Sequence, residues 1–210
     1  MQKRAVPFRE YFLLNANPVI RFLILSDVIW ISGTGLLGPI FALFIVGFID
    51  GGDAAVAGVA ATIYLVTKSF LQIPVASLID RIHGERDDFW MMFVGSMGTV
   101  LMPLLYLSIH TPLQLYLVQF LYGAMAACTF PSFMAIFTRH IDRTREGTEW
   151  GIYFTLTDLS SATAASVGGI LATTIGFRPV IVGVVLLGIF GVLLLLPIKP
   201  YISGNRRKRT

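Results

Sequence analysis

Three ionisable side chains lie inside the long apolar segments of this 210-residue sequence, where charged groups are rare. They are Asp27, Lys68 and Asp158. A helix rises about 1.5 Å per residue, so all three are expected in the same half of a bilayer, where they are able to meet. A lone charge at that depth costs roughly 2.5–3.5 kcal/mol, and each is therefore expected to find a counter-charge or water.

Two acids and one base support two interpretations of these charges. In the first, Lys68 forms an ion pair with Asp27 or Asp158 whose only role is to fix helix packing. In the second, the carboxylate that is left over titrates and binds a proton or a cation. Neutral side chains on the same segments would then offer hydrogen bonds to a solute. The candidate coupling and substrate path comprises Asp27, Thr34, Tyr64, Lys68, Gln72, Gln119, Thr155, Asp158 and Ser161.

The composition places these residues in a membrane protein, whose first partner is the lipid bilayer. Hydrophobic residues make up 55% of the chain and charged residues only 13%, about half the charged share of a soluble domain. The apolar runs predict an all-α, polytopic fold with six transmembrane helices, at about residues 20–46, 54–79, 89–109, 113–137, 149–174 and 179–198. They form one transmembrane domain at residues 19–199. A cytoplasmic amphipathic segment is predicted at 1–18 and a basic cytoplasmic tail at 200–210.

The basic residues lie in loops and at the chain ends. With the amino terminus in the cytoplasm, the outer turns hold only Arg178, and the remaining loops and ends hold nearly all other Lys and Arg residues. This bias predicts an integral protein of the cytoplasmic membrane with both termini inside. The net charge of +4 therefore gives no indication of a nucleic-acid partner.

The sequence lacks the patterns of enzymes and metal proteins. Cys128 is the only cysteine and lies in an apolar segment, which excludes a disulfide within the chain or a thiolate metal site. No paired histidines occur at metal-binding spacing, and no glycine-flanked serine nucleophile is present. We therefore predict no catalytic residues, no metal and no cofactor.

A charged stretch between the second and third predicted helices carries the most specific motif. Its residues are Ser77, Leu78, Asp80, Arg81, Gly84 and Arg86. The pattern resembles the signature cytoplasmic loop of the major facilitator superfamily, whose order is Gly, Leu, Asp, Arg, Gly and two basic residues. Ser77 replaces the first glycine here, and Glu85 interrupts the basic pair. Gly84 is expected to adopt a turn conformation that residues with side chains avoid.

The distribution of polar residues among the predicted helices agrees with that resemblance. Helices one, two, four and five carry Asp27, Lys68, Gln119 and Asp158, whereas helices three and six carry no ionisable residue. A polar, polar, apolar order that occurs twice is typical of a 3+3 inverted repeat with a peripheral third helix. The resemblance implies half of a major facilitator fold, in which helices one, two, four and five border the central path.

The same resemblance implies secondary-active transport of a small molecule or ion by alternating access. A chain similar to the amino-terminal half of such a transporter needs a second wall, and a parallel homodimer of half-transporters would supply it. The cytoplasmic latch motif would then place Asp80 near residues 149–153 of the partner. Proton coupling would follow if one intramembrane acid titrates. One half of a hetero-oligomeric transporter, a fragment of a longer transporter and a non-transporting scaffold or accessory subunit are the alternatives. Substrate and coupling direction stay open.

Overall fold

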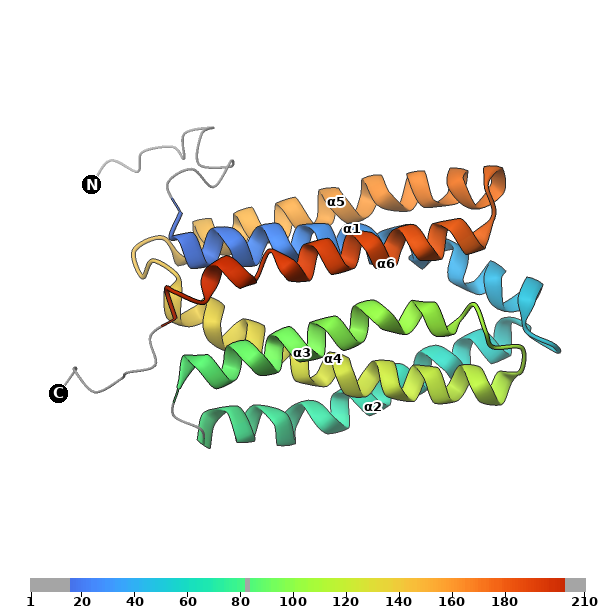
Figure 1. Cartoon of the computed structure of the whole chain (residues 1–210), viewed down its shortest axis with the longest axis horizontal. Helices are drawn as coiled ribbons and strands as arrows, with labels where there is room; N and C mark the ends of the chain where they lie inside the picture. Colours follow the sequence, from blue (N-terminus) through green and yellow to red (C-terminus); the bar gives the residue numbers. More distant parts are fainter. Residues whose placement is uncertain (1–15, 82–83, 203–210) are drawn as a thin grey trace.

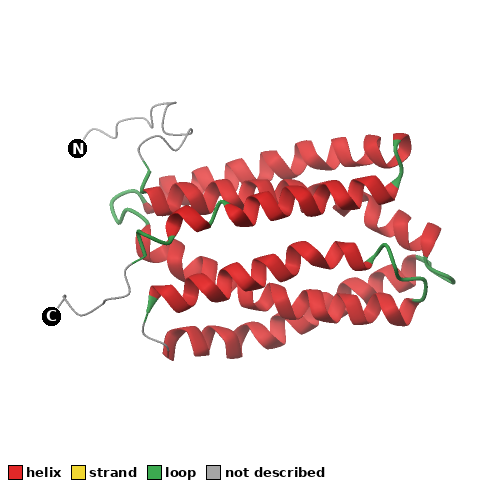
Figure 2. Cartoon of the chain, viewed as in Figure 1, coloured by secondary structure: helices red, strands yellow, loops and turns green. Residues whose placement is uncertain are grey.

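The computed structural model describes residues 16–81 and 84–202, and all regular secondary structure among them is helical (Figure 2). The helices are α1 (Pro18–Phe48), α2 (Ala54–Arg81), α3 (Glu85–Leu105), α4 (Pro112–His140), α5 (Glu146–Thr174) and α6 (Phe177–Leu193), followed by the short 3-10 helix η2 (Leu196–Ile198). The predicted all-α fold is confirmed. The predicted segment at 1–18 lies outside the described residues except for its last three, and the basic tail is described only to Ile202.

The six long helices run up and down along one axis. In Figure 1, α1, α3 and α5 begin at the end of the bundle where α2, α4 and α6 finish. We call this the Asn17 end and the opposite one the Asp50 end. Asn17 and Thr111 show local signals for helix starts that the sequence encodes. Asn17 Oδ1 accepts a hydrogen bond from Val19 N at 3.0 Å, and Thr111 forms a capping box with Gln114. Both satisfy amides that a helix start leaves without partners.

Five segments of the described chain are long and apolar enough to cross a membrane. They are Pro18–Phe48, Ala54–Arg81, Glu85–Leu105, Pro112–His140 and Phe177–Ile198. The fifth predicted span, α5, has 29 residues but falls outside this set. Its many Thr, Ser and Gly residues, together with Asp158, lower its mean hydropathy. It nevertheless packs along α1 in the same bundle.

The helices form two groups of three. α1 packs mainly against α5 and α6, whereas α4 packs mainly against α2 and α3, and the groups meet chiefly where α3 contacts α6 (Figure 1). The first helix of each consecutive three-helix unit therefore packs against the second and third helices of the other unit. The largest apolar cluster lies toward the Asn17 end and includes Leu23, Phe89 and Phe137.

Helix α2 presents an apolar face that the other described residues leave uncovered. Phe70 and Ile73 are 77% and 76% exposed, and only Ala60, Thr67 and Ile79 of this helix are buried. Apolar exposure on this scale is expected where a helix faces lipid or a second protein unit. The buried residues lie toward α4, which is the principal neighbour of α2.

Candidate functional site

A cavity of about 240 Å³ lies between the helices, and side chains from all six of them line it. Its charged groups are Asp27 from α1 and Lys68 from α2, and its polar lining includes Tyr64, Thr129 and Tyr153. Most of the remaining lining is apolar. We call it the Asp27 cavity. Helices α3 and α6, expected outside the path, add uncharged side chains to its wall.

The carboxylate of Asp27 is held by a side chain far away in the sequence. The hydroxyl of Tyr153, 126 residues later on α5, donates a hydrogen bond to Asp27 Oδ2 at 2.5 Å. Tyr153 is buried on the face of α5 that packs against α1. The residue types alone carry no signal for this pair, because helical spacing does not reveal which faces of two helices meet.

Lys68 lies in the same cavity without an acidic partner among the described residues. Its Nζ lies 5.2 Å from the centroid of the Phe130 ring, a cation–π contact between α2 and α4. The ion pairs found in the described ranges involve Asp88 and Glu85 instead. The predicted ion pair of Lys68 with Asp27 or Asp158 is therefore absent among the described residues. Phe130, which the sequence did not single out, takes that place beside the ammonium group.

A glycine sets the distance between α2 and α4 at this level. A Cβ atom on Gly123 would lie 2.6 Å from the carbonyl oxygen of Tyr64 and 3.2 Å from Lys68 N. The contact with the carbonyl oxygen of Tyr64 is shorter than real Cβ atoms show, so glycine lets the two backbones approach this closely. This approach positions both Tyr64 and Lys68 against α4. The ring of Tyr64 also lies 5.0 Å from that of Tyr122, between centroids.

A second cavity, of about 260 Å³, gathers other predicted residues. Thr34, Tyr64 and Gln119 line it together with Tyr106 and Tyr122. Gln119 is 4% exposed and its Nε2 donates to the hydroxyl oxygen of Tyr106 at 3.2 Å. Tyr64 lines both this cavity and the Asp27 cavity. Its side chain therefore lies at the boundary between them.

The remaining predicted path residues lie elsewhere. Gln72 lines a groove of about 870 Å³ between α2 and α4. Thr155 and Asp158 are exposed on α5, and Ser161 is half-buried. None of these three α5 residues is among the lining of the two cavities. Asp27 and Asp158 therefore do not share a site in this chain.

The latch motif is mostly helical rather than a loop. α2 continues to Arg81, so Ser77, Leu78, Asp80 and Arg81 all lie in its last turns, and Arg86 lies in the first turn of α3. Ser77, Asp80 and Arg81 line the same groove as Gln72. The conformation expected for Gly84 is wrong: its φ of 177° is extended backbone, which any residue adopts. It serves as the residue before the first turn of α3.

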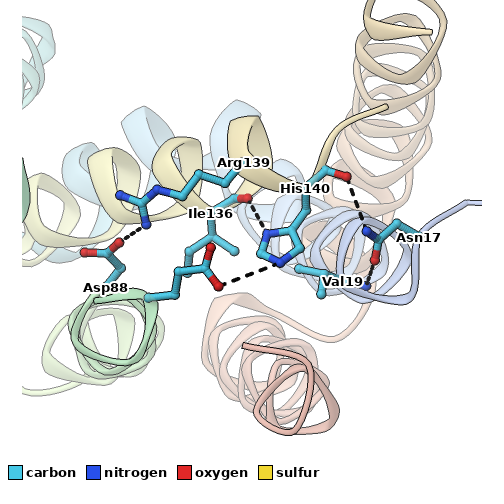
Figure 3. A network of polar contacts seen from close by, with 7 residues as sticks. Asn17, Val19, Asp88, Ile136, Arg139 and His140 are labelled. Atoms are coloured by element: carbon cyan, nitrogen blue, oxygen red, sulfur yellow. Dashed lines mark hydrogen bonds and ion pairs between the residues drawn. The ribbon is translucent and has the colours of Figure 1, made fainter. Parts of the chain in front are cut away.

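A polar network joins three helices at the Asn17 end (Figure 3). Arg139 Nη1 of α4 pairs with Asp88 Oδ2 of α3, whose side chain is 1% exposed. Asn17 Nδ2 donates to the carbonyl oxygen of His140 at 3.4 Å. Asp88 and Arg139 fall in or beside polar loops by sequence, but helices α3 and α4 extend far enough to include both. The network therefore ties α1, α3 and α4 together.

The geometry around His140 fixes the position of its proton. Nδ1 lies 3.0 Å from the carbonyl oxygen of Ile136, and a carbonyl only accepts, so Nδ1 donates. Nε2 lies 3.9 Å from Glu85 Oε2. His140 belongs to the last turn of α4.

The connection between α4 and α5 is held by an ionised aspartate. Asp142 Oδ1 accepts hydrogen bonds from Thr144 N at 2.9 Å and from Thr144 Oγ1 at 2.8 Å. These donors stabilise the anion and lower the pKa of Asp142 below its usual range. The backbone N of Asp142 donates to Glu149 Oε2 at 3.3 Å, which connects the loop to the first turns of α5.

Comparisons with known proteins agree on one family. A family model described as Major Facilitator Superfamily matches residues 23–210. The chain is 26% identical over 189 residues to the multidrug resistance protein MdtG of Escherichia coli O9:H4 (strain HS), and 27% identical over 191 residues to MdtG of Klebsiella pneumoniae (strain 342). Each alignment covers 85% of this chain but only 44% and 43% of the relative, so the chain spans less than half their length.

A solved structure shows the same fold. The crystal structure of the POT family transporter PepTSo superposes with a TM-score of 0.74, covering 91% of this chain and 39% of that chain. The sequence identity is 12%, so this match concerns the arrangement of helices alone. The helices described above therefore reproduce part of a larger fold in that protein.

Proposed function

Because this chain belongs to the Major Facilitator Superfamily, we propose that it forms one six-helix half of a secondary transporter, which moves a small solute by alternating access. Members of this family are transporters rather than enzymes, in agreement with the sequence prediction. The observation that carries the proposal is a cavity between the helices that holds the two charges Asp27 and Lys68. A charge in a membrane domain is costly, and access to a solute or water path is the usual reason for keeping one.

We propose that a second chain of the same kind completes the path. Asp158 is exposed on α5 and Phe70 on α2, and a carboxylate facing lipid would be costly. A second unit in the same orientation would cover these faces and enclose the path, with both termini of each chain in the cytoplasm. A different six-helix half would satisfy the same geometry, so the identity of the second unit needs its own test.

The packing pattern supports the 3+3 repeat within one six-helix chain. Exchanging α1 with α4, α2 with α5, and α3 with α6 converts each of the principal contacts into another principal contact. Two three-helix units related by a pseudo-two-fold axis would pack in this way. Rocking of the two six-helix chains against each other would then expose the path to each side of the membrane in turn.

We propose Asp27 as the proton-coupling group. It is the only acid among the described residues that line the Asp27 cavity, and Tyr153 Oη donates to it. Protonation would remove the charge of Asp27 and change the strength of this hydrogen bond. The site would then have two states that bind a solute differently. Asp158, outside the cavities, is assigned instead to the face that the second unit covers.

The Asp27→Asn variant is expected to lose transport, on the order of tenfold or more in rate, because an amide cannot exchange a proton at neutral pH. Since the relatives are named multidrug resistance proteins, a bacterium without its main drug-efflux pumps would express the chain and face a panel of antimicrobial compounds. Asp53→Asn is the matched control. Asp53 lies at the Asp50 end, where its Oδ1 accepts from Val56 N at 2.8 Å, and asparagine keeps that acceptor. Protection by Asp27→Asn equal to that of the unmodified chain would exclude the coupling role.

Homodimerisation predicts a crosslink between different chains. In a Cys128→Ala background, one tagged chain would carry Asp80→Cys and a differently tagged chain Gly151→Cys. Gly151 is exposed in the second helical turn after Arg145, and a side chain there meets nothing within 4 Å. The latch proposal expects a disulfide joining the two tags. Asp53→Cys with Gly151→Cys is the control, since these positions lie at opposite ends of the bundle (Figure 1). Equal crosslinking in both pairs, or none in the first, contradicts the homodimer.

A further inference from the structure

Lys68 is an ammonium group that faces a cavity without an acidic partner among the described residues. Its Nζ contacts the Phe130 ring at 5.2 Å from the centroid, an interaction of about 0.5–2 kcal/mol that does not neutralise charge. Lys68 is half-buried, and the aromatic contact brings no negative charge to its side chain. The site is therefore electrostatically incomplete, and an anion entering the cavity would complete it.

The other charge of the cavity is already engaged by its neighbours. Asp27 accepts the short hydrogen bond from Tyr153 and is partly buried. No ion pair joins Asp27 and Lys68 in the described part of the chain. The remaining titratable groups that line the cavity, Tyr64 and Tyr153, are neutral phenols at physiological pH. An incoming anion thus meets the positive charge of Lys68, and Tyr64 brings a hydroxyl group to the same lining.

The rest of the lining selects for an apolar body. Trp30, Phe130, Phe133 and Met92 are among the apolar residues that line the cavity with the charged groups. Aromatic faces and a thioether pack well against flat or alicyclic rings. A small, fully hydrated inorganic anion would gain little from such a surface, because it would lose its water without apolar burial in return.

We propose that the Asp27 cavity binds an amphipathic organic anion, whose acidic group pairs with Lys68 and whose apolar body packs against Phe130 and Trp30. This inference rests on the proposed transport function and names its substrate class. Asp27 bears a like charge when ionised, so its protonation favours anion binding.

Three ligands with one ring system and different charges test this inference. They are 2-naphthoate, the neutral 2-naphthamide and the cationic 2-naphthylmethylammonium. Binding would be measured by equilibrium dialysis on the full chain in phosphatidylcholine nanodiscs, with empty nanodiscs to subtract partition into lipid. We expect 2-naphthoate to bind at least tenfold more tightly than the other two, and Lys68→Gln to weaken it on the order of tenfold.

Lys199 provides a matched control. Its Nζ also lies 5.2 Å from an aromatic ring centroid, that of Trp90, but it is exposed and lines neither cavity. Lys199→Gln is expected to keep the affinity for 2-naphthoate, and Lys68→Arg is expected to retain most of it. Asp27→Asn is expected to strengthen it. Nanodiscs containing phosphatidylglycerol distinguish two sources of the anionic group: competition identifies a lipid headgroup, and unchanged affinity identifies a solute.

Three results would each overturn the anion site. The first is equal affinity for the three ligands, and the second is no binding of 2-naphthoate to the unmodified chain at millimolar concentration. The third is an equal loss of 2-naphthoate affinity in Lys68→Gln and Lys199→Gln. Those results leave the transport function intact, because it is judged by the drug-protection assay with Asp27→Asn. Conversely, a 2-naphthoate site that depends on Lys68, in a chain that protects against no compound, would support the binding site and contradict the transport function.

Discussion

Replacing Arg139 by methionine is expected to lower the free energy of unfolding by about 3–5 kcal/mol, because it leaves a buried carboxylate without its counter-charge. Asp88 is 1% exposed, and Arg139 supplies its only ion pair among the described residues. The other carboxylate oxygen, Oδ1, is buried and has no hydrogen-bond partner in the described part of the chain. The loss should appear as a lower midpoint of thermal or detergent unfolding in lipid nanodiscs.

Two further variants separate the lost ion pair from the lost side chain. Arg143→Met removes an arginine that is exposed in the next loop, so its effect is expected to stay within about 0.5 kcal/mol. The double variant Arg139→Met with Asp88→Asn removes both charges and should recover a large part of the stability. A double variant no more stable than Arg139→Met alone would show that the packing of the arginine stem, and not the charge, is what matters.

Valine at position 168 is expected to separate α5 from α1 and to destabilise the bundle by about 1–3 kcal/mol or more. A Cβ atom on Gly168 would meet the backbone carbonyl group of Leu36 and would lie 2.8 Å from the Leu36 Cα. A backbone cannot rotate away as a side chain can, so the helices themselves must move apart. The same helix pair carries the Tyr153 to Asp27 hydrogen bond, and the variant is therefore also expected to reduce transport.

The neighbouring glycine makes an internal control for this prediction. A side chain on Gly169 would meet nothing within 4 Å, and both positions lie in the interior of α5. Gly169→Val therefore carries the same change in helix propensity, without the collision. The unfolding midpoints of the two variants should differ clearly in the same lipid. Equal midpoints would mean that α1 and α5 do not approach as closely as the structure indicates.

Much of the fold follows from local patterns that the sequence displays directly. The predicted all-α fold is confirmed because a bilayer-length apolar run must satisfy its backbone hydrogen bonds internally, and a helix does so. Pro112 begins α4 behind a Thr111 cap, and such caps act over only a few residues. Helix ends were less predictable, since α2 and α3 both extend into the charged stretch that the sequence pattern indicated as a loop.

The candidate site was only partly predictable. Asp27 and Lys68 stand out in the sequence because charges inside apolar segments are rare, and they line one cavity. Asp158 stands out for the same reason but lies on an exposed face of α5. Tyr153 is an ordinary aromatic residue in the sequence, yet it donates to Asp27. Residue type therefore indicated which side chains are unusual, but not which of them meet.

The sequence by itself determined the membrane class, the helical fold, the family and the rare charges that the helices carry. The tertiary structure alone decided that Tyr153 faces Asp27, that Phe130 lies beside Lys68 and that Arg139 pairs with Asp88. The physical reason is the range of the forces involved. Hydropathy and capping act within one helix, whereas the rotation of each helix against its neighbours depends on close packing across the bundle, at contacts such as that of Gly123 with α2.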